Sequence, residues 1–328
     1  LKRQRPEAVL ANTLLTFPVV EAAARLGVPA VWIIHESYSS DTLARLFPPF
    51  ARGRIDAAFA LAARVVPASH DTARLFADKN GRGNFRVLHN GLDPAPFDDY
   101  LRKVTKAEAA RITGDTGEKV RFISVGTVCE RKGQHTLVEA AAELARTRND
   151  FVVQVIGLRD AVPYAAHLRG LVRRHRLESC VQLVPETDGV WPYFRAADVF
   201  VCTSHIETFS RAVLEAEAFG LPIVSTPVFG LDEQVFWGFN ALQFPTGDAA
   251  ALADRLARLL DDPALRRSMG EKSRAAFDAH LDYGEMLDRY EAVLLAAARS
   301  GPRGRTPWPA GDARGAVRLP LPGLRATR

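Results

Sequence analysis

Short apolar runs alternate along the chain with alanine-rich segments in which apolar residues recur at helical spacing. This alternation is typical of parallel βαβ units, because strands buried on both faces are apolar throughout and their crossover helices are apolar on one side. The predicted strands are 8–11, 30–34, 65–68, 85–88, 120–125, 151–156, 181–184, 199–203 and 223–225. The predicted helices are 17–26, 134–146, 164–175, 191–196, 211–219, 250–260 and 283–298. The pattern therefore predicts an α/β protein with two Rossmann-like domains and parallel sheets.

The two predicted domains are unequal in length. The first, residues 1–113, offers four strands and lacks the opening strand–loop–helix that usually starts such a domain. We therefore interpret it as incomplete and the chain as N-terminally truncated. Residues 89–97 carry Asn-Gly and two prolines, which is turn chemistry, and polar residues 98–118 are expected to hold a helix and then a linker.

The second predicted domain, residues 114–282, carries the longer alternation of strands and helices. A C-terminal helix is expected over residues 283–299. Residues 300–328 are rich in Gly, Pro and Arg without periodicity, which predicts a disordered basic tail. No G-x-G-x-x-G follows any strand, so a nicotinamide dehydrogenase is a poor fit.

The net charge of +5 lies in the tail, where residues 301–328 carry six arginines and one aspartate. The remaining 300 residues are neutral, which argues against a nucleic-acid-binding core. Cys129, Cys180 and Cys202 form no CxxC pair and are expected to be reduced. No apolar run reaches the roughly 18 residues of a membrane span, and no signal peptide is recognisable. We expect a cytoplasmic protein whose tail can contact the inner face of the membrane peripherally.

The first candidate binding site lies in residues 203–219. These residues are predicted to form a strand end, a loop and a helix that begins near Phe209. In an open parallel sheet, ligands sit outside the carboxyl ends of the strands, and a helix N-terminus there suits a phosphate. Glu207 precedes the helix, and Glu215 lies about 9–12 Å further along it. That separation suits a ligand with hydroxyls at both ends and a diphosphate between them, such as a nucleotide sugar.

Each acid also has a simpler interpretation. Glu207 alone would stabilise a helix dipole, and Glu215 alone would be a solvated helix residue. Glu217 lies about 200° around the helix from Glu215, so the two acids cannot share a face. We predict that Glu217 faces solvent.

A second basic cluster follows the strand at 120–125. Arg131 and Lys132 lie in its loop before the next helix, where two cations could neutralise a diphosphate. Taken alone, the loop would be an ordinary exposed basic loop. Because both loops are expected at one edge of one sheet, we favour a binding site.

At these residues the chain resembles the retaining, GT-B fold glycosyltransferases called group 1 or family 4, across most of residues 6–299. The resemblance rests on "VGTVCERKGQ", on "YFRAADVFVCTSHIETFSRAVLEAEAFGLPIVSTPVFGLDEQV" and on "GFNALQF". "VLHNGLD" resembles the Asn-Gly-x-Asp turn that closes the N-terminal domain of the family. The resemblance implies two Rossmann-like domains of the GT-B type and a role in cell-envelope polysaccharide synthesis.

The resemblance also implies roles for individual residues. Glu207 would lie near the donor sugar, Glu215 on the ribose, and His35 of "WIIHES" would face the sugar from the N-terminal domain. His35 could instead be an ordinary hydrogen-bonded residue at a strand end. The implied catalytic residues are His35, Lys132 and Glu207, and the implied donor-binding residues are Gly126, Arg131, Lys132, Thr208, Phe209, Ser210 and Glu215. Backbone N–H groups at 208–210 would join the cations on the diphosphate.

The sequence departs from the family pattern at three places. Thr127 stands where an arginine often follows the strand glycine, and Glu217 stands where a methionine is usual. The first strands and their glycine-rich loop are not recognisable, which leaves the activity of this chain by itself open.

The implied reaction is transfer of a sugar from a nucleoside diphosphate to a glycan, lipid-linked or small-molecule acceptor, with retention at the anomeric carbon. No cofactor and no metal are expected, since no D-x-D occurs in the chain, and no nucleic-acid partner is expected. The alternatives are a non-catalytic nucleotide-sugar-binding module of a larger protein, and a GT-B-like epimerase or phosphorylase.

Overall fold

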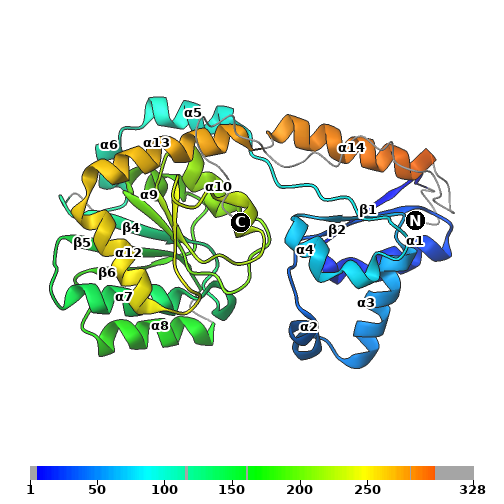
Figure 1. Cartoon of the computed structure of the whole chain (residues 1–328), viewed down its shortest axis with the longest axis horizontal. Helices are drawn as coiled ribbons and strands as arrows, with labels where there is room; N and C mark the ends of the chain where they lie inside the picture. The colour runs from blue at the N-terminus through cyan, green and yellow to red at the C-terminus, as the bar shows by residue number, and fades with distance from the viewer. Residues whose placement is uncertain (1–5, 115–116, 160–161, 281, 300–328) are drawn as a thin grey trace.

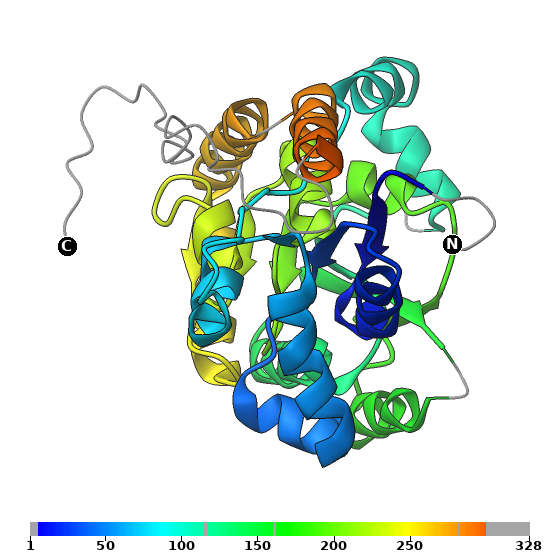
Figure 2. The same cartoon turned by 90° about the vertical axis from the view of Figure 1, so that its right-hand side faces the viewer.

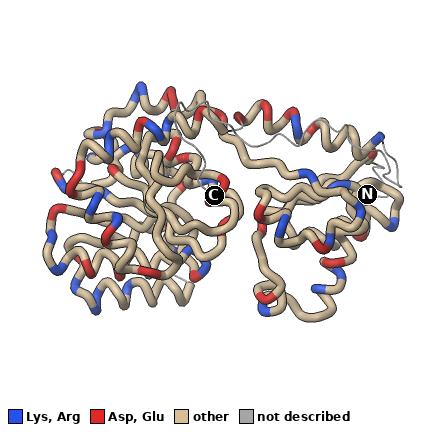
Figure 3. Tube along the Cα trace, viewed as in Figure 1, with Lys and Arg blue, Asp and Glu red and all other residues tan. Residues whose placement is uncertain are grey.

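Two parallel sheets organise the chain in this computed structural model, which describes residues 6–114, 117–159, 162–280 and 282–299. Each sheet belongs to one α/β unit, and the two units lie side by side (Figure 1). Basic and acidic residues are interspersed along the described parts of both units (Figure 3). No helix among the described residues is both long enough and apolar enough to cross a membrane.

The first unit is built on a three-stranded parallel sheet of order β1-β2-β3. Its strands are β1 (Val9–Asn12), β2 (Ala30–Ile34) and β3 (Arg64–Pro67). Its helices are η1 (Leu14–Thr16), α1 (Phe17–Arg25), α2 (Ser40–Leu46), α3 (Pro49–Leu61), α4 (His70–Leu75) and η2 (Ala77–Lys79). Strand β2 is buried along its whole length, and Trp32 packs on Phe59 of α3 with ring centroids 4.9 Å apart.

The predicted fourth strand of this sheet, residues 85–88, is wrong as a strand. Phe85 makes a single bridge to Val65 of β3, and the N–H groups of Arg86 and Leu88 then donate to carbonyls of β3. The segment therefore runs beside β3 with only part of a parallel ladder, because Pro67 at the end of β3 has no N–H to donate to it.

The second unit holds a six-stranded parallel sheet of order β6-β5-β4-β7-β8-β9. Its strands are β4 (Val120–Val125), β5 (Phe151–Leu158), β6 (Val181–Pro185), β7 (Val199–Cys202), β8 (Ile223–Ser225) and β9 (Ala241–Gln243). The order of the strands reverses between β4 and β7, so the loops that follow these two strands flank the crevice in which open α/β sheets bind ligands.

Helices cover both faces of this second sheet. One face carries α7 (Gln134–Ala145), α8 (Pro163–Arg174) and α12 (Ala249–Asp261). The other carries α5 (Pro94–Lys103), α9 (Trp191–Ala196), α10 (Arg211–Ala218), α11 (Leu231–Gln234) and α13 (Pro263–Ala279), with α6 (Lys106–Ile112) packed on α9. The stretch expected to be a helix and a linker is thus two helices, α5 capped by Asp93 and α6 by a Thr105–Glu108 capping box.

The last described helix, α14 (Tyr283–Arg299), returns from the second unit to the first. Its buried residues Val293 and Ala297 join Val31 and Ile33 of β2 in one apolar cluster. Figure 2, in which the first unit lies nearer the viewer, shows α14 running along its upper side. The first sheet is therefore covered on its second face by a helix from the far end of the chain. The predicted disordered tail, 300–328, lies outside the described residues.

Candidate active site

Two loops meet at the point where the strand order reverses. One runs from β4 through the short helix η3 (Glu130–Lys132), and the other runs from β7 to α10. The N–H of His205 donates to the carbonyl of Arg131 at 2.8 Å, and Thr203 Oγ1 donates to the carbonyl of Lys132, also at 2.8 Å. Gly133 has φ 62°, and a Cβ there would clash with Thr203 O, so this close approach requires glycine.

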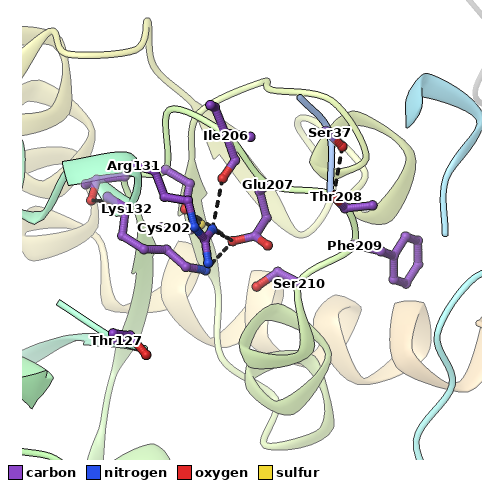
Figure 4. A network of polar contacts seen from close by, with 12 residues as sticks. Ser37, Thr127, Arg131, Lys132, Cys202, Ile206, Glu207, Thr208, Phe209 and Ser210 are labelled. Atoms are coloured by element: carbon purple, nitrogen blue, oxygen red, sulfur yellow. Dashed lines mark hydrogen bonds and ion pairs between the residues drawn. The ribbon is translucent and has the colours of Figure 1, made fainter. Parts of the chain in front are cut away.

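The side chains of this crevice converge on one carboxylate, that of Glu207 (Figure 4). Lys132 Nζ is ion-paired and hydrogen-bonded to Glu207 Oε2, and Arg131 Nη1 lies 3.9 Å from the same oxygen. Ser204 Oγ donates to that oxygen at 3.4 Å, and Arg131 also donates to the carbonyl of Ile206 at 3.2 Å. Two cations therefore surround one acid, which leaves an excess of positive charge for an anionic ligand.

The glycine at the end of β4 lies beside this cluster. A Cβ at Gly126 would sit 3.8 Å from Lys132 Cε, and a Cβ at Gly157 of β5 would clash with the Gly126 carbonyl. The structure thus brings Gly126, Arg131, Lys132 and Glu207 together. Thr127, which replaces the expected arginine, is exposed and lies apart from the Lys132–Glu207 pair (Figure 4).

Helix α10 begins at Arg211, as in the predicted helix 211–219 and two residues after the start near Phe209 that was assumed for the phosphate site, and Ser210 is its N-cap. The N–H of Ser210 donates to Gln234 Oε1 at 2.8 Å, so this group is already engaged and the prediction that it faces a ligand is wrong. Within the described part of the chain, the N–H groups of Thr208 and Phe209 have no hydrogen-bond acceptor. These two N–H groups can therefore donate to a ligand near the N-terminal end of α10.

Thr208 joins the loop of the second unit to the first unit through a chain of buried hydroxyls. Thr208 Oγ1 donates to the carbonyl of His35 at 2.7 Å and lies 2.8 Å from Ser37 Oγ. Ser37 Oγ lies 2.6 Å from Thr72 Oγ1, which lies 2.8 Å from Ser69 Oγ. Because each hydroxyl has one proton, the donations must run in one direction, from Ser69 to the carbonyl of His35.

Phe209 contacts the first unit on the opposite side of the same loop. Its ring stacks on His89 with centroids 4.6 Å apart, and its carbonyl accepts from Asn90 Nδ2 at 3.2 Å. The ring is buried and points away from Glu207 (Figure 4). The side chain of Phe209 is therefore a packing group, and only its backbone can serve a ligand.

His35 directly follows strand β2, and its carbonyl accepts from Thr208 of the second unit. Its Nε2 lies 2.9 Å from Asn12 Oδ1, and burial lowers the pKa of the imidazole, which favours its neutral form. The neighbouring Glu36 accepts from the N–H groups of Leu14 and His35 at 2.9 and 3.0 Å. Burial raises the pKa of Glu36, against the lowering effect of these bonds.

Asn12 and Glu36 were not predicted as site residues. Glu36 adjoins His35 in "HES", and Asn12 directly follows the predicted strand 8–11, so the rule that strand ends gather at one edge could have found both.

Glu215 lies inside α10, and its side chain is buried. Arg211 Nε donates to its carboxylate at 3.2 Å, and burial raises its pKa. Among the described residues, no contact joins Glu215 to Lys132 or Glu207. The structure therefore places Glu215 on the helix that follows the site loop but outside the cluster around Glu207.

The prediction that Glu217 faces solvent is wrong. Glu217 is fully buried, Asn240 Nδ2 donates to its Oε1 at 2.9 Å, and His280 Nε2 lies 3.0 Å from its Oε2. Burial raises the pKa of this carboxyl. Helix α13 packs over α10 on the side away from the sheet, so α10 has no fully solvated face for this acid.

Comparison with known proteins places these features in a family. The family model described as glycosyl transferases group 1 matches residues 105–276, and the model of glycosyltransferase family 4 matches residues 1–96. The chain belongs to the group 1 glycosyltransferases. The resemblance inferred from the motifs is thereby confirmed.

Curated relatives of this group 1 glycosyltransferase include a D-inositol 3-phosphate glycosyltransferase of Pseudarthrobacter chlorophenolicus, 33% identical over 246 residues. That match covers 69% of this chain and 59% of the relative, and a second such enzyme from Arthrobacter is covered over 44% of its length. A glycogen synthase of Mycobacterium tuberculosis is 25% identical over 305 residues, 90% of this chain and 70% of that protein. The chain thus spans about half of the length of the first two relatives.

Solved structures share the fold. The Anabaena protein HepE in complex with UDP-glucose aligns with a TM-score of 0.77 at 20% identity, over 88% of this chain and 79% of that one. Sucrose-phosphate synthase from Thermosynechococcus elongatus aligns with a TM-score of 0.76 at 24% identity, over 89% and 74% of the two chains. The predicted fold class, an α/β GT-B arrangement with parallel sheets, is confirmed.

Proposed function

We propose that this group 1 glycosyltransferase transfers a sugar from a nucleoside diphosphate to an acceptor hydroxyl, with retention of the anomeric configuration. The observation that carries the proposal is the cluster of Arg131, Lys132 and Glu207 at the strand-order reversal, beside the unengaged N–H groups of Thr208 and Phe209. Solved relatives hold UDP and UDP-glucose, which supports a nucleotide-sugar donor.

The proposed chemistry is electrostatic. The bond between the anomeric carbon and the diphosphate breaks through an oxocarbenium-like transition state, and negative charge develops on the leaving diphosphate. Arg131 and Lys132, with the two N–H groups, would stabilise that charge. No metal is proposed for this step, because fixed cations and backbone dipoles supply the same stabilisation.

Glu207 has two parts in this proposal. Its carboxylate orients Lys132 through their ion pair, and its second oxygen would accept a hydrogen bond from a donor-sugar hydroxyl. His35 would approach the sugar from the first unit, in the neutral form that its burial favours. Glu215 is proposed to accept a hydrogen bond from a ribose hydroxyl, which requires its partner Arg211 to remain on the solvent side.

The acceptor is proposed to be a glycan, a lipid-linked sugar or a small molecule with a free hydroxyl, and the site of action the cytoplasm, with peripheral contact at the membrane. A role in cell-envelope polysaccharide synthesis is consistent with relatives such as the amylovoran biosynthesis glycosyltransferase of Erwinia amylovora.

Calorimetric titration with UDP, GDP and ADP tests the donor site. We expect heat of binding with one of the three, because the proposed diphosphate contacts all come from residues 126–215 of the second unit. Absence of heat with all three at millimolar concentration would overturn the proposal.

The second candidate is a non-catalytic nucleotide-sugar-binding module, favoured by the three-stranded first sheet. It predicts diphosphate binding without transfer. Incubating the chain with the nucleotide sugar that binds, with and without added acceptors, separates the two: released diphosphate together with a glycosylated product supports the transferase.

A further inference from the structure

A second group of ionisable side chains lies at the contact between the two units, behind Phe209. It consists of His70 at the start of α4, His89 in the segment after β3, and Glu233 in α11. One potential ligand atom from each of the three lies within 4.8 Å of the other two. Two of these residues come from the first unit and one from the second, so the group spans the interface.

The spacing suits a metal ion with nitrogen and oxygen ligands. His89 Nε2 lies 3.1 Å from Glu233 Oε2. Two ligand atoms bound tetrahedrally to Zn²⁺ at about 2.0–2.1 Å lie roughly 3.3–3.4 Å apart, so these two atoms already stand near that separation. The rings of His70 and His89 are perpendicular, with centroids 5.7 Å apart, which lets both present a ring nitrogen to one point.

The surroundings hold the ligands in place. Glu233 accepts from the backbone N–H groups of His70 and Asp71 at 2.8 and 2.6 Å, which fixes the carboxylate and leaves lone pairs for a further partner. The His89 ring is fixed by stacking on Phe209. His70 is exposed, and the side chains of His89 and Glu233 are 17% and 15% exposed, so an ion can enter from solvent. Outer contacts of this kind orient metal ligands in proteins.

We propose that His70, His89 and Glu233 bind a divalent transition metal ion such as Zn²⁺, and that this ion joins the two domains. The ion takes the place of the proton between His89 Nε2 and Glu233 Oε2, and solvent completes its coordination. Imidazole and carboxylate donors suit Zn²⁺ better than Mg²⁺ or Ca²⁺, which prefer oxygen ligands alone. This site lies on the other side of Phe209 from Glu207 and would hold the two domains in the arrangement described here.

Zn²⁺ calorimetry on tag-free, chelator-treated protein tests the proposal, with Co²⁺ absorption as a second probe of the coordination. The native chain should bind a single ion, and His70→Ala and His89→Ala should each weaken binding by more than about tenfold. Glu233→Gln keeps one acceptor oxygen for the backbone N–H groups of His70 and Asp71 but loses the second oxygen and the charge, and it should also weaken binding. His175→Ala removes an exposed histidine elsewhere and should change nothing.

Two results would overturn the proposal. The first is the absence of Zn²⁺ binding by the native chain. The second is loss of binding in His135→Ala with His70→Ala unaffected, which would place the ion near His205 and His167, whose ring centroids lie 5.7 and 6.2 Å from that of His135.

A separate measurement tests whether the metal ion joins the two domains. Zn²⁺ should raise the melting temperature of the native chain and not that of His89→Ala, since a ligand that binds only the folded form stabilises it. Nucleoside diphosphate binding in the presence of chelator should be retained. Failure of the metal site and failure of the donor site are therefore distinguishable. An equal rise in melting temperature for the native chain and His89→Ala would contradict the bridge.

Discussion

At the scale of single residues, Lys132 is the side chain on which the proposed donor site depends most. Its stem lies beside Gly126 and its ammonium is fixed by Glu207, so the charge is oriented before any anion binds. A fixed charge loses little conformational entropy when it takes up a ligand, and this increases its effect on affinity.

We predict that Lys132→Ala weakens binding of the nucleoside diphosphate by about tenfold or more, since it removes a charged hydrogen-bond partner. The matched control is Lys103→Ala on α5, whose side chain is 71% exposed. Titration of both variants with the same diphosphate is the measurement. Equal affinities would show that the basic loop does not face the phosphates.

Substitutions of Glu207 and of Glu215 should have different effects, because the two acids are proposed to bind opposite ends of one donor. We predict that Glu215→Gln weakens diphosphate binding, since the ribose is present with or without a sugar. Glu207→Gln should keep most of that affinity, because the amide oxygen can still accept from Lys132, and it should lower the rate of transfer.

Glutamine is the appropriate replacement at both positions because both acids are largely buried, and alanine would add a cavity to the loss of charge. Binding and transfer rates measured on the same preparations decide the matter. A large loss of diphosphate affinity in Glu207→Gln would mean that Glu207 supports phosphate binding or folding and does not bind the sugar.

At the scale of elements, the loop between β7 and α10 is held on both sides by the first unit. The hydroxyl chain through Thr208 fixes one side, and the stack of Phe209 on His89 fixes the other. The loop that carries Glu207 is therefore positioned by both domains.

We predict that Thr208→Val, which keeps the shape and removes the hydroxyl, lowers the free energy of unfolding by about 1–3 kcal/mol. The reason is that Ser37 loses its acceptor and the carbonyl of His35 loses its donor in a buried place. Thr147→Val, at an exposed threonine, is the control. Urea unfolding of both variants measures the difference, and equal stabilities would mean that the hydroxyl chain contributes nothing.

The elements themselves show what the sequence could predict. Buried parallel strands are apolar throughout, so β2, β4, β5 and β7 were predictable from local pattern. Strand β9, Ala-Leu-Gln, has only two apolar residues and was not predicted, whereas the equally short β8 ends the apolar run Leu221–Val224 and was. Helix α13 was missed because charged residues and serines interrupt its apolar positions, and its packing over α10 depends on tertiary contacts that local sequence does not show.

In the site, too, features that depend on tertiary contacts could not be predicted from local sequence. The loops after β4 and β7 were predictable, because parallel strands end at one edge. The burial of Glu217 was not, since its partners Asn240 and His280 come from distant segments. The engagement of the Ser210 N–H by Gln234 is equally non-local.

At the scale of the whole molecule, helix α14 links the stability of the two units. Val293 and Ala297 are buried against the first sheet, while the helix follows directly on the second unit. A change on this helix should therefore affect the first unit although it lies at the other end of the chain.

We predict that Val293→Asp lowers the free energy of unfolding by about 2–5 kcal/mol, because it places a charge in an apolar contact. Leu295→Asp, on the same helix with a side chain that is 46% exposed, should have little effect. Thermal unfolding measures the stability of both variants. Limited proteolysis then shows whether the first unit is the part that becomes accessible. Equal melting temperatures for the two variants would show that α14 does not cover this sheet in solution.

The return of α14 to the first sheet also sets an order on folding during synthesis. The face of β2 that carries Val31 and Ile33 stays uncovered until residues 283–299 have left the ribosome, although β2 itself emerges early. All six strands of the second sheet are made before that helix. Domains usually complete their folds in the order of synthesis, N-terminal first. Here the second domain can finish first, and the apolar face of the nascent first domain stays exposed to aggregation until residues 283–299 are made.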